Sequence, residues 1–167
     1  YTQFTDTEFI LTETKTNLFI PQRYYERYGE YHLLLSKELD IKEDDEIRFT
    51  FCHNDGKSHV QKIEFYFKSM GNASYYFLNM ITPYRVNIED TNTKFLVFVN
   101  RKQIVNNKDY YIDNEEGVLV FLNDQLASST NDRIDLVCFY TGIDDTATAD
   151  LPMSGYIYLK RNMIDRN

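Results

Sequence analysis

The chain has 167 residues, of which 26 are acidic and 18 are basic, so its formal charge is −8 and its pI lies near 4.9. Such an acidic molecule repels phosphate backbones, which argues against non-specific binding of nucleic acid. With 43% apolar residues, 12 Phe and 14 Tyr, the composition is that of a folded protein with a large core. A purely apolar run such as Phe95–Val99 is far shorter than the ~20 residues of a membrane-spanning helix, so we expect no membrane partner.

Clusters of Val, Ile, Phe, Tyr and Thr with short polar breaks recur along the chain, which indicates strands rather than helices. In chain order we expect strands at Glu8–Thr12, Tyr31–Leu35, Glu46–Cys52, Lys62–Lys68, Tyr75–Ile81, Lys94–Val99, Gly117–Leu122, Arg133–Tyr140 and Gly155–Lys160. Pro21–Tyr28 is the only segment that we expect could form a helix, because Pro is favoured in the first turn of a helix. The predicted fold class is all-β.

Alternation of side chains predicts which strand faces are buried. Ile47, Phe49 and Phe51 share one face of their strand and polar residues occupy the other, as expected where one sheet face packs on a core. Phe95–Val99 and Val118–Leu122 are apolar on both faces. We therefore expect these two to be central strands or strands covered by a neighbour.

The segment Met70–Ser74 carries turn residues between two aromatic runs, Ile63–Phe67 and Tyr75–Leu78. A loop of this length and composition is typical of a β-hairpin. We expect the two aromatic runs to pair with each other across it.

The two halves of the chain share one pattern. Thr7–Tyr25 aligned with Thr93–Tyr111 without gaps gives four identities in 19 positions, including a Tyr-Tyr pair in each copy. Further along, residues of the same type match in the same order: Gly29 with Gly117, Leu35 with Leu122, Leu39 with Leu126, Asp45 with Asp132 and Ile47 with Ile134. Regular strand spacing in any sandwich could produce some of this likeness. We favour a repeat, and expect two tandem, similar antiparallel β-sandwich (immunoglobulin-like) modules, 1–84 and 85–167, with a boundary near Tyr84–Thr93.

The second copy carries a longer pattern: Thr93–Asn100, Asp109–Ile112, Gly117–Phe121, Leu126 and Asp132–Tyr140. This pattern resembles a small β-sandwich module common in the tail, baseplate and fibre proteins of tailed bacteriophages. The resemblance covers Thr93–Thr141, with a weaker echo over Thr7–His53. The sequence departs from the module at Arg101 and Asn131, where Gly is usual, so these turns need not be of the same type.

The resemblance implies a non-enzymatic structural or adaptor component of a phage particle, in the tail, collar, baseplate or fibre. Its expected partners are other virion proteins in a homo- or hetero-oligomeric assembly. Its expected location is the virion, assembled in the host cytoplasm. Because the chain does not begin with Met, we also expect it to be a processed chain or a piece of a longer one.

No catalytic or metal-binding pattern stands out, and we expect no cofactor and no enzymatic activity. Cys52 and Cys138 lack the spacing of a zinc site and are expected to be small buried residues. His32, His53 and His59 lack the spacing of a metal site and are expected to be ordinary surface or half-buried residues.

Three acidic segments offer carboxylates that could bind Ca²⁺: Glu43–Glu46, Asp113–Glu116 and Asp144–Asp145. None has the residue order of a dedicated calcium loop. We favour solvated loops whose charge aids solubility and protects strand edges from pairing.

We expect core packing to account for most of the tyrosines in the Tyr-rich segments. These segments are still the first place where we expect an interface, because Tyr combines a flat apolar ring with a polar tip. The candidate interface residues are Tyr24, Tyr25, Tyr28, Tyr31, Tyr75 and Tyr76. The alternative functions are a module that binds a host-surface glycan or protein, and a bacterial adhesin repeat.

Overall fold

The structure is a computed structural model that describes residues 8–28, 32–42, 45–51, 60–71, 75–78, 93–123, 125–141, 155–160 and 165–166. Its strands are β1 (Phe9–Glu13), β2 (Phe19–Ile20), β3 (Tyr25–Tyr28), β4 (His32–Leu35), β5 (Glu46–Phe51), β6 (Val60–Lys68), β7 (Tyr75–Phe77), β8 (Lys94–Val99), β9 (Lys102–Gln103), β10 (Tyr110–Asp113), β11 (Val118–Phe121), β12 (Arg133–Thr141), β13 (Gly155–Lys160) and β14 (Asp165–Arg166). Each of the nine segments expected to be a strand contains one. The all-β prediction is confirmed.

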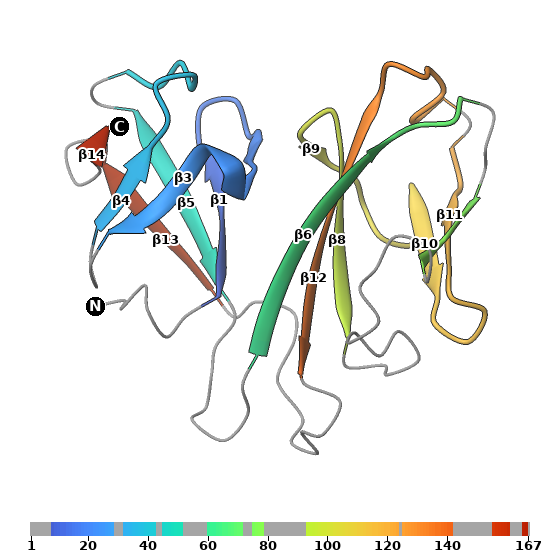
Figure 1. The fold of residues 1–167 in the computed structure, drawn as a ribbon. Helices are drawn as coiled ribbons and strands as arrows, with labels where there is room; N and C mark the ends of the chain where they lie inside the picture. The colour runs from blue at the N-terminus through green and yellow to red at the C-terminus, as the bar shows by residue number, and fades with distance from the viewer. Residues whose placement is uncertain are drawn as a thin grey trace.

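The strands form four small sheets arranged as two units (Figure 1). Sheet A has the order β13-β5-β1-β2 and faces sheet C, β14-β4-β3, to form the first unit. Sheet B has the order β6-β12-β8-β9 and faces sheet D, β10-β11-β7, to form the second unit. Within the described residues, the pairings between these strands are antiparallel except that of β14 with β4.

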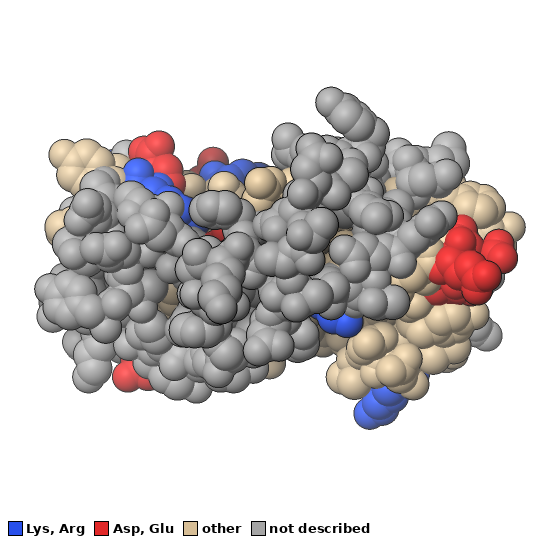
Figure 2. Space-filling view, turned by 90° about the horizontal axis from the view of Figure 1, so that it is seen from below, with Lys and Arg blue, Asp and Glu red and all other residues tan. Residues whose placement is uncertain are grey.

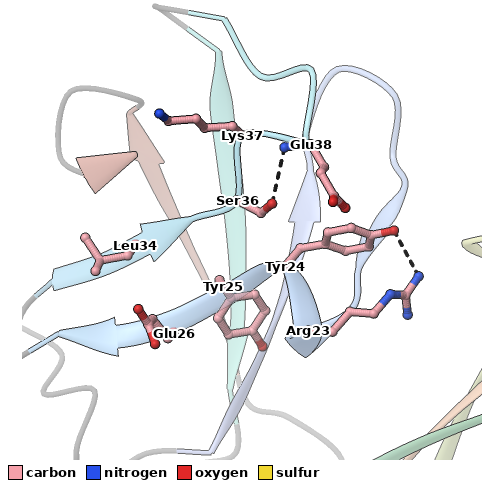
Figure 3. Close-up of a pocket in the computed structure, with 8 residues that line it drawn as sticks. All are labelled: Arg23, Tyr24, Tyr25, Glu26, Leu34, Ser36, Lys37 and Glu38. Atoms are coloured by element: carbon pink, nitrogen blue, oxygen red, sulfur yellow. Dashed lines mark hydrogen bonds between the residues drawn. The ribbon is translucent and has the colours of Figure 1, made fainter. Parts of the chain in front are cut away.

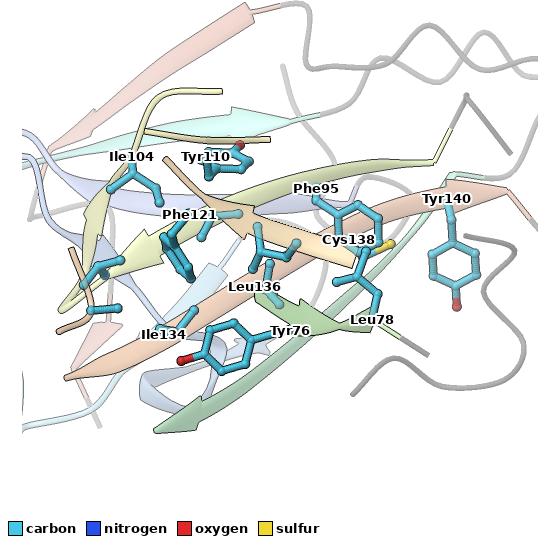
Figure 4. Packing of buried hydrophobic residues seen from close by; sticks show 14 residues of the cluster. Tyr76, Leu78, Phe95, Ile104, Tyr110, Phe121, Ile134, Leu136, Cys138 and Tyr140 are labelled. Atoms are coloured by element: carbon cyan, nitrogen blue, oxygen red, sulfur yellow. The ribbon is translucent and has the colours of Figure 1, made fainter. Parts of the chain in front are cut away.

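Each unit encloses its own apolar core, as in a β-sandwich. The first core includes Phe9 and Leu11 from sheet A and Leu33 from sheet C. The second includes Leu136 from sheet B and Tyr76 from sheet D, with other members drawn in Figure 4. The facing predicted for β5 is confirmed for Ile47 and Phe49, which are fully buried; the side chain of Phe51 lies outside the described residues.

The two units repeat the same register of paired strands. The residues that lie opposite one another are Ile157, Phe49 and Leu11 in sheet A, and Phe65, Leu136 and Val97 in sheet B. The turn before each long strand is also equivalent, because Asp45 accepts the Lys42 N–H at 2.8 Å and Asp132 accepts the Ser129 N–H at 3.0 Å. The Asn100 side chain also donates to Asp132. The hydrogen bonds from Asn100 and Ser129 lower the pKa of the Asp132 carboxyl group.

Strand pairing crosses the expected boundary at residue 84. β6 and β7 precede that boundary but pair with β12 and β11 of the second unit. β13 and β14 follow it but pair with β5 and β4 of the first unit. In both units, therefore, strands from the expected range 1–84 pair with strands from the expected range 85–167.

A third buried cluster joins the units and explains why β8 is apolar on both faces. Its members are Ile10 and Phe19 from sheet A and Phe98, Val137 and Phe139 from sheet B. The rings of Phe19 and Phe98 stack with centroids 4.1 Å apart. Sheet B is therefore covered by its own core on one face and by the first unit on the other.

Arg101 binds the two units together at the edge of this cluster. Its backbone has a φ of 71°, a left-handed conformation that favours the Gly expected from the resemblance. Its guanidinium donates to the Phe19 carbonyl at 2.9 Å and to Glu13 at 2.7 Å, while its own carbonyl accepts the Phe19 N–H. These inter-unit contacts offset the cost of a non-glycine residue in this conformation.

Two local predictions are wrong. The aromatic runs on either side of Met70–Ser74 do not form a hairpin, because β6 joins sheet B and β7 joins sheet D. The chain arches between the sheets so that Phe67 and Tyr76 meet in the second core, with ring centroids 4.9 Å apart. Pro21–Tyr28 is not an α-helix; a single 3-10 turn, η1 (Gln22–Tyr24), leads into β3, whose pairing places Tyr25 in the first core.

Candidate protein-binding face

The tyrosines expected to form an interface do not lie on one surface. Tyr28 and Tyr75 are exposed, at 62% and 52%, but they belong to different units. Tyr24 is half-buried. Tyr25 and Tyr76 are buried, and Tyr31 lies outside the described residues.

The buried tyrosines have structural roles. The Lys62 ammonium lies between the Tyr25 hydroxyl, at 3.3 Å, and the Phe9 carbonyl, at 2.6 Å. Burial raises the pKa of Tyr25 well above its usual range, and the nearby Glu64 carboxylate raises it further. The Tyr76 hydroxyl accepts the Met70 N–H at 3.1 Å within the second unit. The rings of Tyr25 and Tyr76 therefore fill the two cores and leave little of either side chain at the surface.

The outer face of sheet D is open to solvent and apolar apart from Asp113, which lies opposite Val118 at one end of it. Tyr111, Val120 and Tyr75 lie side by side across its three strands, and Val118 lies opposite Phe77 in the next row. Tyr75, Phe77 and Tyr111 are 52%, 48% and 37% exposed. We call these five residues the aromatic face.

The aromatic face is held in place from beneath. Tyr76, Leu119 and Phe121 point to the opposite side of the same strands and are buried in the second core. The exposed Tyr75 and Phe77 rings meet edge to face, with centroids 5.5 Å apart. Because the backbone beneath is fixed by sheet pairing, the face offers a rigid surface that would lose little entropy on binding.

Acidic residues border the aromatic face where β10 turns into β11. Glu115 and Glu116 are exposed there, and Asp113 holds the turn by accepting the Glu116 N–H at 3.0 Å. Gly117 closes the turn with a φ of 69°, which a residue with a side chain rarely adopts. Figure 2 shows acidic side chains gathered beside uncharged surface at the end of the molecule formed by the second unit.

A second candidate is a groove of about 470 Å³ on the first unit (Figure 3). Its lining residues are Arg23, Tyr24, Tyr25, Glu26, Leu34, Ser36, Lys37 and Glu38. The Arg23 guanidinium donates to the Tyr24 hydroxyl at 3.1 Å and lies 4.4 Å from the centre of that ring. A half-buried aromatic ring with both donors and carboxylates around it can stack on a sugar and bind its hydroxyls.

The described residues hold no group of three or more His, Cys, Asp and Glu side chains that could bind a metal ion. Burial raises the pKa of the Cys138 thiol to about 12, so this cysteine is a neutral core residue, as expected. His32 is exposed on β4, while Cys52, His53 and His59 lie outside the described residues. Within the described part of the chain, no helix has the length and apolarity needed to cross a membrane.

Comparison with models of protein families, with curated proteins and with solved structures finds no match to this chain.

One sequence feature marks the aromatic face. Val118–Leu122 is apolar on both faces, and we expected a central strand or a strand covered by a neighbour. β11 is the central strand of sheet D, but Val118 and Val120 face outward beside exposed rings while Leu119 and Phe121 are buried. An apolar strand whose outer face has no cover within the described chain marks a surface suited to a partner.

Proposed function

We propose that this chain is a non-enzymatic structural or adaptor component of a tailed-phage particle, in its tail, collar, baseplate or fibre. The observation that carries the proposal is the aromatic face, a rigid and solvent-facing set of rings on the outermost sheet of the second unit. Interfaces concentrate aromatic residues at their centre and charge at their rim, and this face has both. The expected partner is another virion protein, bound in the particle after assembly in the host cytoplasm.

The phage resemblance supports the same conclusion from an independent direction. The resembling segment Thr93–Thr141 begins at the residue before β8 and ends with β12, so it supplies most of the second unit. We further propose that the two units are copies of one immunoglobulin-like sandwich, encoded by 1–84 and 85–167 and completed by each other's strands.

The double variant Tyr75→Ser and Phe77→Ser should fold normally, because both side chains are exposed. Its incorporation into particles should fall by about tenfold or more, because aromatic side chains that become buried at an interface contribute most of the binding energy. Incorporation is measured by the amount of the chain in purified particles. Tyr28→Ser is the matched control, since Tyr28 is at least as exposed as Tyr75 and Phe77 but lies on sheet C of the first unit. Normal incorporation of the double variant would contradict docking through this face.

The groove on the first unit favours a second candidate function, recognition of a host-surface glycan. Tyr24→Ala removes its ring, so glycan-array signals should fall to background if sugars bind there. Tyr111→Ala removes a ring of the aromatic face and should leave the signals unchanged. Absence of binding by the unmodified chain would remove this candidate.

A further inference from the structure

Each repeat ends on a strand that joins the other unit. β5 belongs to the first unit, yet the next strand along the chain, β6, pairs with β12 of the second unit. After β12 the chain returns, and β13 pairs with β5 (Figure 1). The two repeats have therefore exchanged their closing strands.

The exchange leaves the pairing of each unit unchanged. Lys160 of β13 lies opposite Glu46, the first residue of β5, and Lys68 of β6 lies opposite Arg133, the first residue of β12. The two closing strands thus occupy equivalent positions with the same orientation. A sheet edge recognises such a strand by main-chain hydrogen bonds and register, so any chain that carries the strand can supply it.

We propose that a second copy of this chain binds by the same exchange: β13 of one copy pairs with β5 of the other and completes its first unit. The closed chain and the exchanged pair contain the same β5–β13 hydrogen bonds, so they differ mainly in the entropy of joining two molecules. Covalent linkage gives a chain's own β13 a high effective concentration, which keeps the chain closed in dilute solution. Crowding of copies in an assembly favours the exchanged pair by mass action.

The exchange uses β13 rather than β6 because β6 is anchored on both faces. Ile63 and Phe65 pack on the second core. On the opposite face, Lys62 donates to the Phe9 carbonyl and Glu64 accepts the Gln22 N–H at 2.9 Å, which fixes β6 to the first unit as well. Among the described strands β13 pairs with β5, and β14, which follows it, pairs with β4, so these two pairings have to open.

The exchange between copies rests on the proposed function, because it would join copies of this chain within the assembled particle. The two fail separately, because exchange is measured on the purified chain and docking through the aromatic face is measured in particles.

The test mixes two variants of the full chain, Glu46→Cys and Lys160→Cys, whose substituted positions lie opposite each other only when β13 pairs with β5. Both carry Cys52→Ser, while Cys138 stays because its buried thiol is protonated. The mixture is unfolded, refolded at low and high concentration, oxidised, and examined by non-reducing electrophoresis and mass spectrometry. A chain with both substitutions is the control for closed pairing.

We expect a covalent heterodimer linked between positions 46 and 160, whose ratio to monomer rises about tenfold for each tenfold rise in monomer concentration. The control should form its internal disulfide at low concentration. Absence of the heterodimer at the highest concentration, with the control closed, would overturn the exchange between copies. Failure of the control to close would overturn the pairing of β5 with β13 on which the proposal stands.

Discussion

Phe49→Ala should lower the free energy of unfolding by about 3–5 kcal/mol, and Leu136→Ala by about 2–5 kcal/mol. Both side chains are fully buried at equivalent positions, the middle of β5 in the first unit and of β12 in the second. The Phe49 ring also stacks on Phe9, with centroids 4.3 Å apart, so its loss leaves a cavity beside a second aromatic ring.

The measurement is urea unfolding of each variant, with Val105→Ala as the control for an exposed apolar residue. Val105 is 54% exposed, so its truncation should change stability by less than about 0.5 kcal/mol. A loss below about 1 kcal/mol for Phe49→Ala or Leu136→Ala would show that the facing of that strand is wrong.

Lys62→Ala should cost about 3–5 kcal/mol, because it leaves the Glu64 carboxylate poorly solvated and without its cation. The two charges lie 2.7 Å apart, with side chains only 4% and 13% exposed, between β6 and the first unit. The Phe9 carbonyl and the Tyr25 hydroxyl also lose their partner.

A double variant, Lys62→Met with Glu64→Gln, should recover much of this loss, since neither remaining side chain then carries a charge that has to be desolvated. Lys68→Ala is the matched control, because Lys68 is an exposed lysine on the same strand. Chemical unfolding of the single, double and control variants gives the three free energies. Equal losses in Lys62→Ala and Lys68→Ala would contradict a role for Lys62 in joining the units.

Residue matches between the two halves of the chain predict the positions of equivalent strands better than their exact register. The match between Ile47 and Ile134 places both at the start of equivalent long strands, and both are fully buried. The match between Leu35 and Leu122 fails by one position. Leu35 is buried in the first core, but its counterpart in the second core is Phe121, and Leu122 is exposed. A slip of one residue reverses the facing of a strand, and sequence likeness alone does not fix the register that closely.

The all-β class, nine of the strands and the buried face of strands such as β5 can be predicted from the sequence, because these features depend on local alternation and β propensity. The sheet that each strand joins cannot be predicted in this way. β6 and β13 find their partners in the other half of the chain, and no local pattern encodes a pairing between distant segments. The tertiary structure also decided that Tyr76 fills a core while its neighbour Tyr75 faces solvent, because that outcome depends on what packs against each side of β7.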